Sequence, residues 1–407
     1  MKIVLAYSGG IGSAMALAWL KEKHQAEVIA FCADLGLGES GLEKRAIKAG
    51  AAKVCVEDLQ EEFARDFVFP LIQAGAIRDH QFFVGTSITR PLIAKRLVEI
   101  ARQEKAGGIA HGAAAKGNEP VRFELTAASL APELQVIAPW RDGSYRAQFP
   151  NRAEMIRYCD QHKIPVAVAA KQPYSTDRNL LQTSFEAGVL EDPWFDASDA
   201  GSKGMYQLTV SPEEAPDKAE SITLDFEKGR CTGINHKPLT PLGVMKTLNR
   251  LGGKHGIGRV DLVENRGAGS KSRGVYESPA GAILTCGLGQ IESLALDRET
   301  QRLRDSLVPK YTEFLEYGAW FSPERQALQS ILAETQKNVT GSVKLNLFKG
   351  NVIVAGRKSP QSLYHTQLAA TEADPTQAYN QDDETGFIRM NSLRLKVASH
   401  LANAIKP

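Results

Sequence analysis

The sequence predicts an α/β protein whose first half is built around a parallel sheet. Short, apolar, β-rich runs alternate with helical patterns: strands Ile3–Tyr7, Val28–Ala33 and Val54–Val56, and helices Ala14–Lys23 and Leu42–Lys48. Such alternation is typical of βαβ units, in which helices cover both faces of a parallel sheet. Ligands of these sheets bind at the carboxyl ends of the strands. A glycine-rich turn that follows the first strand is therefore the first candidate binding site.

Further elements are expected along the chain. Helix Pro91–Gln103 and strands Gly108–His111 and Leu134–Ala138 would complete the first sheet. After about residue 170 the pattern changes to turn-rich segments, at Ser175–Arg178 and Ser211–Asp217, between short apolar runs. This change is typical of a second, mixed α+β domain. The runs expected to be strands are Ser221–Phe226, Gly281–Thr285 and Ser342–Val354.

The last part of the chain differs again. Residues 371–385 are acidic and polar, and a modestly amphipathic helix is expected over Met390–Ile405. A polar arm that ends in a helix either docks on another subunit or frays. We therefore expect three parts: a nucleotide-binding domain over residues 1–168, a substrate-binding domain over 169–360, and an arm with a helix over 361–407.

Composition excludes several classes of protein. The 407 residues are 43% hydrophobic, which is enough for two domains with sizeable cores. The net charge of +2, without a block of like charges, argues against nucleic acid as a partner. No window approaches about 18 consecutive apolar residues, so no membrane span is expected. The five cysteines are scattered without a CxxC pair, which indicates reduced thiols in a cytoplasmic protein.

The turn over residues 8–13, SGGIGS, has the composition of a phosphate-binding loop. Glycines let the backbone approach an anion, and the helix expected to begin near Ser13 would point its free N–H groups at the same place. A tight turn without a ligand is the alternative. A Walker loop is excluded because no GK[ST] follows. The dinucleotide pattern GxGxxG occurs at residues 36–41, with Glu57 and Asp58 downstream, but it leaves this turn unexplained.

The turn resembles the PP-loop of the ATP pyrophosphatases, SGGxDS, and longer blocks resemble argininosuccinate synthase. These blocks keep their order from the start of the chain to about residue 396. They are ADLG at residues 33–36, GTSITRPLIAK at 85–95, KGNEPVRFEL at 116–125, IAPWR at 137–141, PYSTDRNLLQTSFEAGVLEDPW at 173–194, GIGRVDLVENR at 256–266, KSRGVYESPAG at 271–281 and GFIRMNSLRLK at 386–396.

The resemblance implies a fold and a reaction. The fold would be an adenine nucleotide α-hydrolase-like domain, then a mixed α+β synthetase domain and a C-terminal oligomerisation helix, assembled as a homotetramer. The reaction would be the joining of citrulline to aspartate with ATP and Mg²⁺: the ureido oxygen attacks the α-phosphorus and releases pyrophosphate, and the aspartate amine then displaces AMP. Such chemistry depends on positioning and charge neutralisation. No protein metal ligands are expected, because the eight histidines lack metal-binding spacing.

The resemblance also implies site residues. Those implied to bind the nucleotide are Ala6, Tyr7, Ser8, Gly9, Gly10, Gly12, Ser13, Ala33, Gly112 and Lys116. Those matching citrulline positions are Phe82, Ser87, Arg122, Ser175, Ser184, Glu264 and Tyr276; Asn118 matches a residue that touches both amino acids, and Ala114 and Glu119 stand at aspartate positions. Ser8, Ser13, Lys116, Asn118 and Arg122 would act in catalysis. Considered alone, Arg122 and Glu264 could equally be surface charges.

Departures from the family pattern cluster at the site. Gly12 stands where the PP-loop has Asp, and the aspartate pocket has Ala114 for Thr and Glu119 for Asp. A lost hydrogen bond to a charged group costs about 1.5–3 kcal/mol, and Glu119 reaches one methylene further. Other departures are Ser13 for Thr, Ala14 for Ser, Leu37 for Gln, Phe82 for Tyr, Pro120 for Gln and Gln182 for His.

Three hypotheses remain open from the sequence. The first is a working argininosuccinate synthase with a weakened or rearranged aspartate site. The second is a diverged ligase that activates citrulline, or a similar ureido or amide substrate, and uses another amine. The third is a protein that binds nucleotide or amino acid and no longer catalyses.

Overall fold

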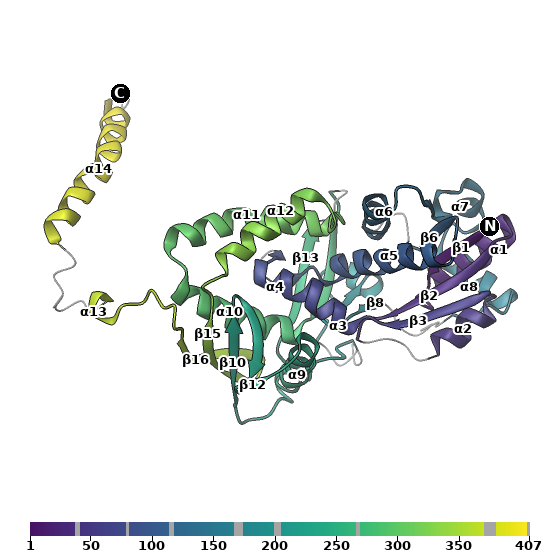
Figure 1. Ribbon diagram of the computed structural model, residues 1–407, viewed down its shortest axis with the longest axis horizontal. Helices are drawn as coiled ribbons and strands as arrows, with labels where there is room; N and C mark the ends of the chain where they lie inside the picture. Colours follow the sequence, from purple (N-terminus) through teal and green to yellow (C-terminus); the bar gives the residue numbers. More distant parts are fainter. Residues whose placement is uncertain are drawn as a thin grey trace. The chain divides into compact units, whose positions relative to one another are not determined.

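The computed structural model describes residues 1–36, 41–78, 81–113, 118–166, 174–198, 205–265, 269–369 and 380–404. Contacts divide the chain into one compact unit over residues 1–361 and a second over 362–407. The boundary expected near residue 168 lies in a segment outside the described residues, so it stays a prediction. Figure 1 shows the elements of both units.

The first sheet is parallel throughout, with strand order β3-β2-β1-β6-β7, which confirms the predicted class (Figure 1). β1 pairs with β2 on one side and with β6 on the other, so the strand order reverses at β1. Loops diverge at such a switch point and leave room for a ligand. The strands are β1 (Lys2–Ala6), β2 (Glu27–Asp34), β3 (Lys53–Asp58), β6 (Gly108–His111) and β7 (Gln135–Ile137).

Helices cover both faces of this sheet because its strands are apolar on both sides. Along β1, Ile3 and Leu5 belong to one buried cluster, and Val4 belongs to the other, as the period of two in a strand requires. The first cluster includes Leu17 of α1, and the second includes Ile88 of α5. The helices of this region are α1 (Ile11–His24), α2 (Leu42–Lys48), α5 (Gly85–Gln103), α6 (Glu119–Leu130), α7 (Gly143–Gln148) and α8 (Arg152–Gln161), with a 3-10 turn η2 (Pro139–Arg141).

A helix with a π-helical turn connects the first sheet to the rest of the unit. It runs as α3 (Gln60–Phe63), the π-helical turn η1 (Ala64–Val68) and α4 (Phe69–Ala74). Pro70 has no N–H, so the regular bond to the carbonyl of Asp66 cannot form. The N–H of Phe69 instead reaches the carbonyl of Ala64, five residues back. A short hairpin, β4 (Ile77–Arg78) and β5 (Phe82–Phe83), follows.

Two antiparallel sheets and four long helices form the rest of the first unit. A four-stranded sheet has the order β13-β14-β9-β8, and a five-stranded sheet has the order β12-β11-β10-β15-β16. The strands are β8 (Ser175–Arg178), β9 (Thr183–Glu186), β10 (Glu220–Glu227), β11 (Arg230–Ile234), β12 (Lys237–Pro238), β13 (Arg259–Asn265), β14 (Lys271–Glu277), β15 (Gly341–Phe348) and β16 (Asn351–Lys358). The helices are η3 (Gly188–Glu191), α9 (Pro241–Lys254), α10 (Pro279–Ala295), α11 (Arg298–Glu316) and α12 (Pro323–Thr335).

Three expectations for this region are wrong. Ser175–Arg178, expected as a turn, is the strand β8, and Gly281–Thr285, expected as a strand, lies inside α10. A short apolar run does not distinguish a buried helix from a strand. Here the run belongs to the long helix α10, which extends well beyond it on the C-terminal side. Ser342–Val354, expected as one strand, is a hairpin. It turns at Lys349 and Gly350, which have φ of 42° and 81°, as a tight two-residue hairpin turn requires.

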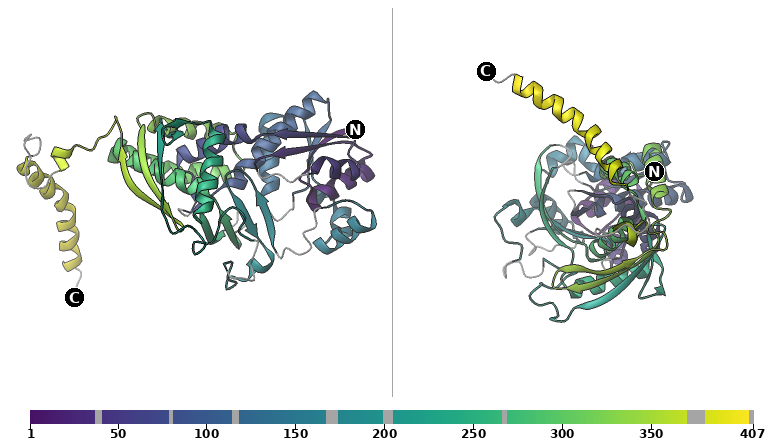
Figure 2. Two further views of the ribbon diagram at one scale, coloured as in Figure 1. Left: turned by 90° about the horizontal axis from the view of Figure 1, so that it is seen from below. Right: turned by 90° about the vertical axis from the view of Figure 1, so that its left-hand side faces the viewer.

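The second unit contains α13 (Thr366–Ala369) and α14 (Gln381–Ala404), the long yellow helix in Figure 2. The expected helix is present and begins nine residues earlier than predicted. The acidic arm lies mostly in residues 370–379, outside the described residues. Several apolar side chains of α14 are exposed, among them Phe387 at 65% and Met390 at 70%. None of the helices in the described part of the chain has the length and hydrophobicity to cross a membrane.

Candidate active site

The glycine-rich turn lies at the switch point, between the end of β1 and the start of α1. α1 begins at Ile11, two residues earlier than expected, with Gly10 as its N-cap. Hydroxyl groups hold the turn from within: Ser13 Oγ donates to the carbonyl of Gly10 at 3.0 Å, and the N–H of Ser8 donates to Ser13 Oγ at 3.2 Å. No side chain among the described residues caps the helix, and its first turn has no acidic residue. The N-terminus of α1 is therefore suited to an anion.

Gly12 is required by a close contact between two loops. A Cβ at Gly12 would lie 2.5 Å from the carbonyl oxygen of Gly112, and a Cβ at Gly112 would lie 2.3 Å from the carbonyl oxygen of Gly12. Gly112 follows β6, the other strand of the switch point. An aspartate at position 12 would thus collide with the second loop. The departure at Gly12 removes an acid and also lets these loops meet.

Arg45 lies beside the turn and was not singled out from the sequence. A Cβ at Gly9 would be 3.2 Å from Arg45 Nη2, so the guanidinium of α2 reaches the loop. Gly9 has φ of 75°, which a glycine adopts without strain. Burial raises the pKa of Tyr7 to about 12; Cys32 adds to this shift, and the positive charge of Arg45 opposes it. No motif marks Arg45, because its position depends on the packing of α2 on the sheet.

The other residues implied for the nucleotide are placed as follows. Ala6 ends β1, and Ala33 lies near the end of β2, its neighbour in the sheet. The turn after β2 packs on the second half of the unit, where the N–H of Leu180 donates to the carbonyl of Leu35 at 2.7 Å. Lys116 lies outside the described residues, as do Ala114 and residues 37–40 of the GxGxxG pattern.

Four of the residues implied for citrulline come from the four-stranded sheet, each from a different strand. Ser184 of β9 pairs with Tyr276 of β14. Tyr276 lies over Gly274, where a Cβ would be 2.2 Å from its hydroxyl, and its hydroxyl donates to Glu264 Oε1 of β13 at 2.6 Å. Ser175 of β8 belongs to the same face, because strand residues two apart share a face and Asp177 pairs with Ser184.

A cluster of ion pairs joins this sheet to the hairpin β4–β5. Arg78 pairs with Glu264 and with Glu316, and its guanidinium lies 4.6 Å from the ring centroid of Phe82. The Phe82 ring in turn lies 4.6 Å from that of Tyr276. Phe82 therefore keeps an aromatic contact with the sheet but offers no hydroxyl to a ligand. Arg78 and Glu316 were missed from the sequence.

A second cluster holds Glu119. Arg90 of α5 pairs with both Glu119 of α6 and Asp177 of β8. The positive charge of Arg90 lowers the pKa of Glu119, although burial opposes this shift. Burial by itself would lower the pKa of Arg90, and the carboxylates of Asp177 and Glu119 outweigh it and raise that pKa. The longer side chain of Glu119 thus ends on an arginine of the protein.

Arg122 is buried, with 6% of its surface exposed, and is not an ordinary surface charge. Its Nε donates to the carbonyl of Glu316 at 2.9 Å. Burial, followed by the nearby charge of Arg90, lowers its pKa to about 10. Asn118, the N-cap of α6, is exposed at the start of the same helix.

Buried polar atoms near the start of α5 have no partner among the described residues. Ser87 Oγ is one, and both amide atoms of Gln182 are others; each residue is about 1% exposed. A Cβ at Gly85 would lie 2.9 Å from Gln182 Cβ, so this side chain packs on the first turn of α5. Buried groups without partners are costly, which is typical of a site that a ligand completes.

Sequence signals were present for two of the missed residues, Asp177 and Arg90. Asp177 follows Ser175 by two residues, the strand period, and Arg90 follows Ser87 by three, within one helical face. The family resemblance identified Ser175 and Ser87 as candidate site residues but did not identify Asp177 and Arg90. Among the described residues no group of three acidic, histidine or cysteine side chains could hold a metal ion.

The parallel sheet and the glycine-rich turn at its switch point define an α/β protein of the nucleotide-binding class, with an antiparallel sheet in the same unit. The chain matches the Arginosuccinate synthase N-terminal HUP domain over residues 2–165 and the Arginosuccinate synthase C-terminal domain over residues 174–398. The chain belongs to the argininosuccinate synthase family.

Curated relatives agree with this assignment. The argininosuccinate synthase of Oleidesulfovibrio alaskensis is 50% identical over 398 residues, covering 97% of each chain. That of Syntrophus aciditrophicus is 49% identical over 400 residues, covering 98% of each chain. A solved structure of a predicted tRNA methyltransferase subunit from Methanocaldococcus jannaschii, with 16% identity over 40% of this chain and 88% of that chain, has a TM-score of 0.28 and carries no argument.

Proposed function

We propose that this enzyme activates citrulline with ATP and joins it to the amine of aspartate, with release of pyrophosphate and AMP. One observation carries the proposal: the turn and the four-stranded sheet belong to one compact unit, and the loop after β2, the strand beside β1, contacts the segment between two strands of that sheet. The bond from Leu180 to Leu35 joins the segment between β8 and β9 to the loop after β2. An α-phosphorus held at the turn would then be within reach of a ureido oxygen held at the sheet, which is the proximity that adenylation requires.

The nucleotide would bind through backbone and hydroxyl donors. The pyrophosphate end of ATP would lie at the N-terminus of α1, with Ser8, Ser13 and the glycine backbone donating to it and Arg45 adding a positive charge. The adenine would lie by Ala33 and Gly112. Lys116 is proposed from the resemblance alone. Mg²⁺ would neutralise charge on the phosphates, which would be its main ligands because the turn has no carboxylate.

Citrulline would bind between α5, α6 and the four-stranded sheet. Arg122 would hold its carboxylate, Glu264 with Tyr276 its ammonium group, and the Ser87 hydroxyl, which has no partner among the described residues, would bond to the ureido group. Ser175 and Ser184 would complete the pocket. Asn118 would contact both amino acids, and Asn118 and Arg122 would orient the reacting groups.

The second amino acid has the less complete site. Glu119 is bound to Arg90, so its carboxylate is directed to the protein. With Ala114 in place of a hydroxyl residue, we expect a high KM for aspartate. The same ion pair favours a second candidate function, in which the citrulline adenylate reacts with an amine other than aspartate.

Pyrophosphate release tests these functions. Release that requires ATP, Mg²⁺, citrulline and aspartate, with argininosuccinate found by mass spectrometry, supports the proposal. Release with citrulline that yields a stable product only with another amine supports the second candidate. Binding of ATP or citrulline without any turnover would overturn both and leave a non-catalytic binding protein.

Assembly, location and domain limits complete the proposal. Exposed apolar side chains along α14, such as Phe387 and Met390, are typical of a helix that packs on another chain, and support a homotetramer. Light scattering on the full chain and on a chain ending at residue 361 would test this. The scattered free cysteines support a cytoplasmic location, and the limits 1–168, 169–360 and 361–407 stay our proposed domains.

A further inference from the structure

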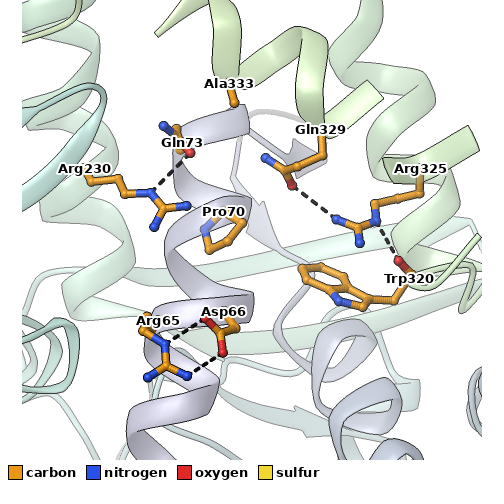
Figure 3. A pocket seen from close by; sticks show the side chains of 9 residues that line it. All are labelled: Arg65, Asp66, Pro70, Gln73, Arg230, Trp320, Arg325, Gln329 and Ala333. Carbon is orange, nitrogen blue, oxygen red and sulfur yellow. Dashed lines mark hydrogen bonds and ion pairs between the residues drawn. The ribbon is translucent and has the colours of Figure 1, made fainter. Parts of the chain in front are cut away.

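A cavity of about 260 Å³ lies outside the candidate active site, between the helix that contains η1 and α4 on one side and α12 on the other. Figure 3 shows its lining. Arg230 of β11 and Arg325 of α12 enter from opposite sides, and Pro70 and Trp320 contribute apolar surface. The π-helical turn supplies Arg65 and Asp66, and such turns are frequent at functional sites.

Arg325 is a buried cation without an acidic partner in the described part of the chain. It is 7% exposed, and its guanidinium lies 4.4 Å from the ring centroid of Trp320. Its Nε donates to the carbonyl of Trp320 at 2.6 Å, and its Nη1 donates to Gln329 Oε1 at 3.3 Å. The Tyr311 hydroxyl also interacts with Arg325; all of these partners are neutral, and Arg325 forms no ion pair among the described residues. A buried charge of this kind favours a counterion.

The remaining charges of the cavity do not supply that counterion. Asp66 is bound in a bidentate pair by Arg65, at 2.8 and 2.7 Å. Arg230 is exposed; its Nε donates to Gln73 Oε1 in a long contact of 3.5 Å, and its positive charge helps Arg65 to lower the pKa of Asp66. Three arginines against one aspartate give the lining a net charge of +2. Neither Arg230 nor Arg325 forms an ion pair with a carboxylate among the described residues, and Pro70 and Trp320 add apolar surface to the lining that they share.

We propose that this cavity binds a small dicarboxylate, with one carboxylate on Arg325, the other on Arg230, and the carbon chain on Trp320 and Pro70. Two negative charges balance the +2 of the lining, and guanidinium groups bind carboxylates with two parallel hydrogen bonds. A phosphate ion matches the arginines but leaves the apolar surface unused.

The cavity is connected to the substrate pocket through the turn after α11. Trp320 follows Gly318, where a Cβ would lie 2.5 Å from Arg122 Cα. Arg122 donates to the carbonyl of Glu316 in the same turn. A ligand that orders Trp320 and Arg325 should therefore change the position of Arg122, the arginine to which we assign the citrulline carboxylate, and with it the affinity for citrulline. This consequence rests on the proposed function, whereas binding in the cavity does not.

Titration calorimetry of the full chain with succinate, at low salt and without substrates, tests the proposal. Succinate should bind, and its neutral diamide should not. Arg230→Gln, at an exposed position, should weaken succinate binding about tenfold or more, because it removes a hydrogen bond to a charge. Arg298→Gln, at an arginine with 74% side-chain exposure that does not line the cavity, is the matched control and should leave binding unchanged.

Several results would overturn the proposal. The proposal is wrong if succinate does not bind, or if inorganic phosphate binds as tightly as succinate. It is also wrong if Arg230→Gln leaves succinate binding unchanged, because succinate would then bind elsewhere, such as at the active site. Arg325→Gln should also abolish binding, with its melting temperature measured first because the residue is buried. If saturating succinate leaves the affinity for citrulline unchanged, the proposed connection through Arg122 is wrong. A protein that binds succinate but has no ligase activity would overturn only the proposed function.

Discussion

The glycine-rich turn and the pocket that we propose for citrulline are each stabilised by different forces. At the turn, Gly12 and Gly112 meet backbone to backbone and serine hydroxyls close the loop, and residues 8–13 contain no charged side chain. In the substrate pocket, Arg78 and Arg90 each join two carboxylates across different elements. Substitutions at the turn should therefore act through steric fit, and substitutions in the pocket should act through charge.

The largest effect is expected in the pocket. Arg90→Gln leaves Glu119 and Asp177 close together without their cation. Breaking a buried pair costs about 3–5 kcal/mol, and the partial exposure of both carboxylates places this change near the lower end. Chemical denaturation measures the loss. Arg298→Gln should cost nothing measurable, and an equal loss in both variants would show that Arg90 has no special role.

The aspartate site should respond to restoration of the family residues. Ala114→Thr together with Glu119→Asp returns two polar contacts, each worth about 1.5–3 kcal/mol, so the KM for aspartate should fall about a hundredfold. Steady-state pyrophosphate release at varied aspartate measures this change, with the KM for citrulline as the internal control. Unchanged or poorer use of aspartate would contradict our account of this pocket.

At the turn, restoring the family acid should be harmful. Gly12→Asp places a side chain against the carbonyl of Gly112, and such overpacking costs about 1–3 kcal/mol. We expect a lower melting temperature and weaker ATP binding. Gly289→Ala, where a Cβ meets nothing within 4 Å, is the control. If Gly12→Asp were instead faster and as stable as the wild type, the segments that contain Gly12 and Gly112 would have to separate readily.

A smaller effect is expected from the hydroxyl of Tyr276. Tyr276→Phe removes its bond to Glu264 and should raise the KM for citrulline about tenfold, with little change in kcat. Tyr364→Phe, at a residue with 64% exposure, is the control. A fall in kcat without a change in KM would assign Tyr276 to the chemical step.

The smallest effect concerns pH. Because Arg90 lowers the pKa of Glu119, this carboxylate stabilises the fold above its unfolded pKa of about 4.3 and loses that contribution as pH falls through its lower folded pKa. Its 36% side-chain exposure limits the contribution to about 1 kcal/mol or less. The stability difference between the wild type and Glu119→Gln should therefore be present at pH 7 and vanish in acid. A difference independent of pH would exclude the ion pair as its source.

The sequence predicted the fold class and the family, because the phosphate turn and the first strands are local patterns. The bounds of the strand Gly108–His111 were predicted correctly, because this β-rich run has a glycine-containing turn on each side. Gly281–Thr285 was mistaken for a strand, because a short run with Ala, Ile and Leu at its centre fits either a strand or a buried helix. The roles of the candidate site residues stay predictions.

The partners of the site residues were not predictable in the same way. Arg45 of α2 lies beside Gly9 in the turn before α1, and Arg78 forms an ion pair with Glu264, 186 residues further along the chain. No motif encodes such distances; the packing of helices and sheets sets them. The resemblance identified Arg122, and only the structure shows that it is buried and bonded to the carbonyl of Glu316.

The contact between Gly12 and Gly112 constrains how this sequence can change. Each glycine occupies the space that a side chain on the other would need, so neither position can gain a side chain while the other loop stays in place. A lineage carrying this pair could regain an acidic phosphate loop only through an intermediate in which the two loops clash, unless a change elsewhere first moves them apart. The loss of the acid is therefore easier to make than to reverse.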